Sequence, residues 1–97
     1  MPALARAQSI QRHVHSTGVL DEDTGRLCER ITANMGQLLH LSDAASRDRC
    51  LGELLFDLAQ LSRKLDIDAE SALREANARF EDWYRAHESA RESEIDI

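Results

Sequence analysis

Apolar residues recur at intervals of three and four along most of the chain, which is the spacing of one face of an α-helix. No segment alternates between apolar and polar residues as a half-buried strand would. The pattern predicts four helices separated by short polar turns, at about residues 3–15, 24–41, 44–64 and 69–87. The sequence therefore predicts one all-α domain, a four-helix bundle over residues 1–87, followed by a polar tail at 88–97 that is expected to fray.

Helix-start signals and apolar stripes agree with this division. Pro2 suits a first helical turn, acidic residues at 21–23 precede the second helix, and Ser42 or Asp43 and then Asp68 can cap the third and fourth. The side chains expected to face inward are Leu4, Ala7, Ile10 and Val14, then Leu27, Ile31, Met35, Leu38 and Leu39, then Leu51, Leu54, Leu55, Leu58 and Leu61, and finally Ala72, Ala76, Phe80, Trp83 and Tyr84.

Length and charge limit the classes of partner. A 97-residue domain buries only about 60 to 65% of its unfolded surface, so we expect a homo-oligomer, in the first place a dimer. The net charge of -6 argues against nucleic acid as a partner, and the sequence has no apolar run of about 18 residues for a membrane. The expected location is cytoplasmic, with Cys28 and Cys50 as reduced thiols, small and buried in helices.

Three segments then point to a family. Residues 2–11 read Pro-Ala-Leu-Ala-Arg-Ala-Gln-Ser-Ile-Gln, residues 52–56 read Gly-Glu-Leu-Leu-Phe, and residues 72–80 read Ala-Leu-Arg-Glu-Ala-Asn-Ala-Arg-Phe. In this order and at these separations they resemble the first, third and fourth helices of MazG-type nucleotide pyrophosphohydrolases. The resemblance implies an all-α dimer, or dimer of dimers, that cleaves nucleoside triphosphates to monophosphates and pyrophosphate with magnesium.

The same resemblance shows a depleted metal site. The family's second helix supplies Glu-Glu-x-x-Glu, which falls here on Ala33, Asn34 and Gln37, and its third supplies Glu-x-x-Asp, which falls on Cys50 and Glu53. These five positions are vestigial, since a single carboxylate beside neutral amides should hold magnesium poorly. A shifted register does not restore the acids, because the second helix contains no acid except Glu29. We therefore expect no catalytic residue, no metal and no cofactor.

Other polar residues leave alternatives open. A polar groove could be formed by Glu29, Asp57, Gln60, Asn77 and Arg79. Within that set, Glu29 and Asp57 could converge with Glu53 on Mg²⁺ or Mn²⁺ as a displaced metal site. Glu75 and Trp83 stand where the family has basic residues, which weakens the expected hold on a triphosphate. A nucleophilic role for Cys50 has no support from a neighbouring histidine in the sequence.

These observations favour an oligomeric binding or regulatory module of the pyrophosphohydrolase fold without metal-dependent catalysis. A nucleotide ligand and a protein partner both remain open for such a module. One alternative is an active nucleoside triphosphate pyrophosphohydrolase that uses the displaced Mg²⁺ or Mn²⁺ site. The other is a purely structural helical interaction module.

Overall fold

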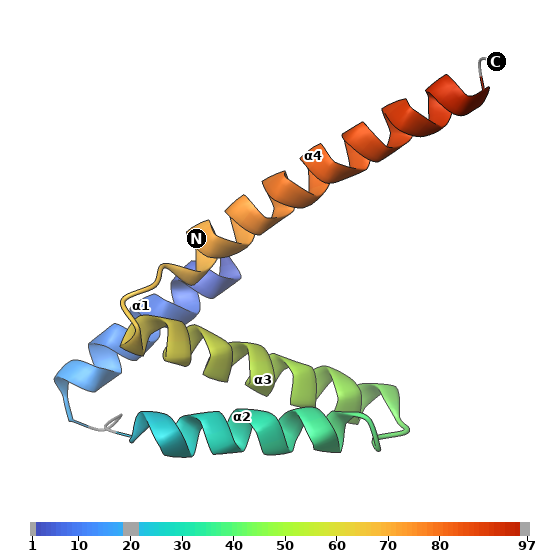
Figure 1. The fold of residues 1–97 in the computed structure, drawn as a ribbon. Helices are drawn as coiled ribbons and strands as arrows, with labels where there is room; N and C mark the ends of the chain where they lie inside the picture. Colours follow the sequence, from blue (N-terminus) through green and yellow to red (C-terminus); the bar gives the residue numbers. More distant parts are fainter. Residues whose placement is uncertain (1, 19–21, 96–97) are drawn as a thin grey trace.

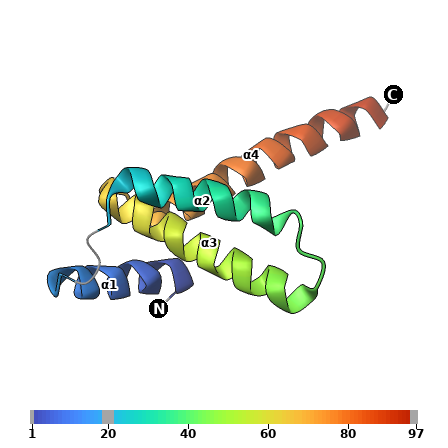
Figure 2. The ribbon, with the colours of Figure 1, turned by 90° about the horizontal axis from the view of Figure 1, so that it is seen from below.

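The computed structural model describes residues 2–18 and 22–95, and within them it confirms an all-α protein of four helices (Figure 1). The helices are α1 (Ala3–Ser16), α2 (Thr24–Leu38), α3 (Ala44–Lys64) and α4 (Ala69–Ile95). α2 and α3 lie side by side and antiparallel, and α1 packs on the other side of α3 (Figures 1 and 2). α4 contacts the other helices near its start and then projects away, which gives overall dimensions of 64 × 33 × 25 Å.

Aspartates cap three of the helices, and for α3 and α4 the sequence predicts such a cap, at Ser42 or Asp43 and at Asp68. The side chain of Asp23 accepts a hydrogen bond from the Arg26 amide, and that of Asp43 accepts one from the Ser46 amide at 2.9 Å. Asp68 accepts hydrogen bonds from two amides at the start of α4. These amide donors lower the pKa of Asp43 and of Asp68, because they stabilise the charged carboxylate. Residue 21 lies outside the described residues.

The helix ends differ from the predicted boundaries at two places. α2 ends at Leu38 rather than near residue 41. α4 continues to Ile95, through most of the segment for which the sequence predicts a frayed tail. The extension has a local cause, since residues 88–95 contain no proline or glycine and are mostly good helix formers such as Ala, Glu and Arg.

The turn between α3 and α4 is built by a left-handed residue. Asp66 has a φ of 59°, its amide donates to the Arg63 carbonyl at 3.1 Å, and the Ile67 amide donates to the Ser62 carbonyl at 2.8 Å. This pair of bonds is the Schellman arrangement that closes a helix C-terminus. It reverses the chain direction and brings residues 66–68 close to α1.

The hydrophobic core is smaller than the apolar stripes predict. Leu27, Ile31 and Leu54 are buried between α2 and α3, and Leu61 packs against them. The expectation of burial was wrong for about half of the side chains predicted to face inward. The following are instead at least 40% exposed: Ile10, Met35, Leu39, Leu51, Leu55, Leu58, Phe80, Trp83 and Tyr84. For the members on α3 and α4, the cause is the direction of α4, which leaves most of its own length and part of α3 uncovered.

Glutamines, not the predicted apolar stripe, form the most buried face of α1. Gln8 is 3% exposed and Gln11 is fully buried. The Gln8 amide donates to the carbonyls of Ala59 and Ile67 and accepts from the Ala69 amide, and Gln11 donates to the Phe56 carbonyl at 2.9 Å. These bonds hold α1 against α3 and the start of α4.

None of the helices in the part of the chain that the structure describes has both the length and the apolar character needed to span a membrane.

Candidate functional site

A groove of about 340 Å³ lies between α2 and α3, where the sequence places the vestigial metal motif. Its lining consists of Arg30, Asn34, Gly52, Glu53, Phe56 and Asp57. Arg30 and Asn34 are one helical turn apart on α2, as are Glu53 and Asp57 on α3, so each pair faces the same way. The buried contact between Ile31 and Leu54 holds the two helices together beneath these side chains.

An ion pair between Arg30 and Asp57 spans the groove. The Arg30 guanidinium donates from Nε to Asp57 Oδ2 and from Nη2 to Asp57 Oδ1, both at 3.1 Å. This is the bidentate geometry in which arginine binds a carboxylate most strongly. The Asp57 side chain is only 12% exposed, whereas that of Arg30 is 42% exposed. Asp57 is therefore a nearly buried carboxylate whose charge is balanced by Arg30.

The ion pair extends to the segment that precedes α2. Arg30 Nη1 also bonds the Glu22 carboxylate, and Lys64 at the end of α3 donates to the Glu22 backbone carbonyl. The hydrogen bonds that Arg30 donates, first to Asp57 and then to Glu22, hold the pKa of Arg30 above its usual value. The positive charge in the groove is therefore permanent and is fixed by two carboxylates.

Glu53, the acid retained from the metal motif, also has an arginine partner. Arg49 lies one turn earlier on α3, and its Nε is 3.3 Å from Glu53 Oε1. Both side chains are largely exposed, at 84% for Arg49 and 61% for Glu53, so this pair is weak and solvated. Each carboxylate that lines the groove, Glu53 and Asp57, thus has a basic partner supplied by the chain itself.

The other vestigial positions divide between the groove and the solvent. Asn34 faces α3, and the Cys50 thiol lies 3.7 Å from the Asn34 carbonyl as a weak donor. Ala33 and Gln37 are exposed on α2 and do not line the groove. Cys28 is exposed as well, which corrects the expectation that both cysteines are buried; both thiols are free, as predicted.

Comparisons with known proteins agree with the resemblance of the three segments. No family model matches the chain. The chain is 33% identical over 88 residues to a nucleoside triphosphate pyrophosphohydrolase/pyrophosphatase MazG from Thermotoga maritima, an alignment that covers 91% of the chain. It is 31% identical over 90 residues, 88% of the chain, to a nucleoside triphosphate pyrophosphohydrolase from Escherichia coli K12. The chain is MazG-like. It spans about a third of the length of these curated relatives, 34% of each.

The MazG-like chain does not assemble the alternative metal site within its described residues. They contain no group of three His, Cys, Asp or Glu side chains that could hold a metal ion. Glu29 is exposed on α2. Because adjacent residues of an α-helix point about 100° apart, Glu29 points away from the groove that Arg30 lines. Asp57 is bound by Arg30 instead. Glu29, Glu53 and Asp57 therefore do not converge, which corrects that alternative.

The predicted polar groove is also not brought together. Of its five residues, only Asp57 lines the cavity between α2 and α3. Gln60 is buried, at 2% exposure. Glu29, Asn77 and Arg79 are exposed, the last two on α4.

Arg30 is the residue of this site that the sequence analysis missed. A signal for it exists, because Arg30 is adjacent to the buried Ile31, and Asp57 lies three residues after the buried Leu54. When the apolar stripes of two helices pack together, side chains of opposite charge that border those stripes can form an ion pair. Pairing them from sequence requires the relative rotation of α2 and α3, which local spacing does not supply.

Proposed function

We propose that this MazG-like chain is a non-catalytic module that forms a homodimer and binds no metal in the groove between α2 and α3. The Arg30–Asp57 ion pair supports this most directly. A metal site for a triphosphate needs several unpaired carboxylates that replace the water shell of Mg²⁺. Here the groove holds a guanidinium whose charge opposes that of an incoming cation.

The residues around the ion pair support the same conclusion. Asn34 and Cys50 offer a neutral amide and a thiol, and a thiol suits softer metals than Mg²⁺. Binding a cation at Glu53 and Asp57 would require both to release their arginines. For Asp57 that means breaking two charge-assisted hydrogen bonds at a nearly buried carboxylate.

The exposed face of α4 supports the homodimer. α4 has 27 residues and is about 40 Å long. Phe80, Trp83 and Tyr84 are 64%, 58% and 48% exposed, and the Phe80 and Trp83 rings lie 5.8 Å apart as one aromatic cluster. A monomer rarely exposes an apolar patch of this kind. A second copy of the chain supplies matching apolar surface on its own α3 and α4, and two-fold pairing would complete both small cores.

Manganese titration tests the metal-free groove. We expect calorimetry to detect no Mn²⁺ site tighter than about 1 mM in the wild-type chain. As a matched control, the double variant Asn34→Glu/Cys50→Glu places two carboxylates beside Glu53, where the structure brings residues 34 and 50 together. This variant is expected to gain Mn²⁺ binding. Sub-millimolar binding to the wild type that is lost in Glu53→Gln would overturn the proposal.

A further inference from the structure

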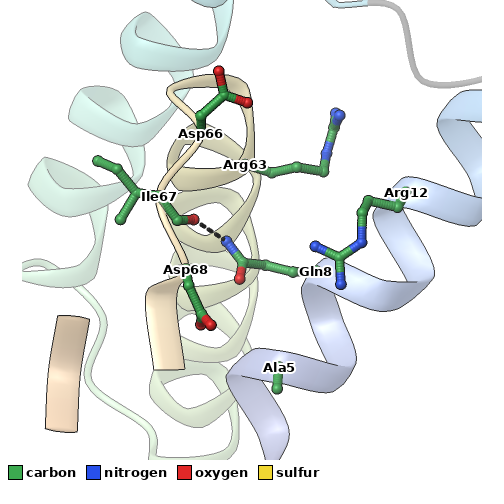
Figure 3. Close-up of a pocket in the computed structure, with 7 residues that line it drawn as sticks. All are labelled: Ala5, Gln8, Arg12, Arg63, Asp66, Ile67 and Asp68. Atoms are coloured by element: carbon green, nitrogen blue, oxygen red, sulfur yellow. Dashed lines mark hydrogen bonds between the residues drawn. The ribbon is translucent and has the colours of Figure 1, made fainter. Parts of the chain in front are cut away.

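A second cavity of about 340 Å³ lies at the C-terminal end of α3, between α1 and the turn into α4 (Figure 3). Arg12 extends into it from α1, and Arg63 extends toward α1 from the last turn of α3. Asp66, Ile67 and Asp68 form the other side. The cavity does not share a residue with the groove that contains Arg30 and Glu53.

The guanidinium of Arg63 has donors without acceptors. Its Nε and Nη2 atoms are buried, and neither has a hydrogen-bond partner. No ion pair among the described residues includes Arg63 or Arg12. A buried charged donor that lacks a partner is costly and is rare in folded proteins. Arg63 also lines the cavity, so a rotation of its guanidinium would present these donors to an oxyanion there.

Two other polar side chains that line the cavity, those of Gln8 and Asp68, already have hydrogen-bond partners. Gln8 donates to the Ile67 carbonyl at 2.9 Å and to the Ala59 carbonyl at 3.2 Å, and its oxygen accepts from the Ala69 amide. The Asp68 carboxylate accepts from the amides and the hydroxyl at the start of α4. Gln8 and the start of α4 are therefore fixed in place, and the two arginines are the hydrogen-bond donors of the lining that remain for a ligand.

We propose that the cavity between α1 and the α3–α4 turn binds a small phosphorylated molecule, with its phosphate between Arg12 and Arg63. Guanidinium groups match the tetrahedral oxygens of phosphate through pairs of parallel hydrogen bonds. The volume lies within the range of pockets for small molecules. Asp66 on the opposite side disfavours a second negative group there, so it selects a ligand whose remaining part is neutral or donates hydrogen bonds. This site is independent of the proposed function and needs no metal.

Calorimetry with inorganic phosphate tests the site, with chloride at equal ionic strength as the reference. We expect phosphate to bind the wild-type chain, and the variants Arg63→Met and Arg12→Met each to weaken binding about tenfold or more. Asp66→Asn removes a negative charge from the cavity and is expected to strengthen binding about two- to threefold. Arg26→Met, at an exposed position on α2, is the matched control and should leave binding unchanged.

The folding of the variants separates a binding role from a structural one. Arg63→Met removes a buried, unpartnered charge, so its melting temperature without phosphate should equal or exceed that of the wild type. Arg12 is exposed, so Arg12→Met tests the site even if the Arg63 variant unfolds. If chloride and phosphate gave the same calorimetric signal, the phosphate would be an adventitious ion only, and the proposal would be overturned. Phosphate binding that survives in both arginine variants would overturn it as well.

Discussion

Replacing Arg30 with methionine is expected to lower the free energy of unfolding by about 2 to 3 kcal/mol, somewhat less than the loss for a fully buried pair. The variant leaves the Asp57 carboxylate, which is 12% exposed, without its two charge-assisted hydrogen bonds. Asp57→Asn should cost less, about 1 kcal/mol, because Arg30 is 42% exposed and can be hydrated. Urea unfolding at fixed protein concentration measures both values.

Two further variants determine whether the loss comes from the Arg30–Asp57 pair. Arg49→Met removes the exposed partner of Glu53 and should change the free energy of unfolding by less than about 0.5 kcal/mol. The double variant Arg30→Met/Asp57→Leu replaces the pair with apolar groups and should recover part of the loss, since no carboxylate is then left unpaired. Equal effects of Arg30→Met and Arg49→Met would show that the groove pair contributes no more than a surface pair.

Replacing Trp83 with alanine is expected to weaken the proposed homodimer about 30-fold or more, the effect typical of a tryptophan at the centre of an interface. The Trp83 ring stacks on the His87 ring with 5.3 Å between the ring centroids, and its centroid lies 5.8 Å from that of Phe80. Trp83 is nevertheless 58% exposed in the single chain. Sedimentation velocity over a range of concentrations measures the dissociation constant of the dimer.

The control for this variant is on the same helix. Arg85 is exposed and pairs with Glu81 and Asp82 within α4, so Arg85→Ala should leave the dimer nearly unchanged. Circular dichroism of the Trp83 variant verifies that α4 is still helical. A wild-type chain that is monomeric at several hundred micromolar, or a Trp83→Ala variant that associates as tightly as the wild type, would contradict the homodimer.

The sequence predicts the helices and their caps because those depend on neighbouring residues. Asp43 and Asp68 act within one turn of their own helices, so the residue types and their spacing suffice. The fold class and the MazG resemblance follow from such local patterns. Of the five vestigial positions that the resemblance assigns, Asn34 and Glu53 line the groove between α2 and α3.

Packing is what the sequence does not supply. Arg30 and Asp57 are 27 residues apart, and the contact of Gln8 with Ile67 spans 59 residues. Each of these depends on how one helix is rotated against another. The exposed apolar face of α4 has the same helical spacing as a buried face. Spacing alone does not distinguish an apolar stripe that packs within its own chain from one that packs against a second chain.

Incubation of the purified chain with the common nucleoside triphosphates, in the presence of Mg²⁺ or Mn²⁺, tests the loss of catalysis most directly. Chromatographic detection of nucleoside monophosphate and pyrophosphate is the measurement. We expect no product above the rate without protein, because Arg30 occupies the groove and binds Asp57, which leaves Glu53 as the one groove carboxylate that Arg30 does not bind. Metal-dependent formation of monophosphate that disappears in Glu53→Gln would contradict it.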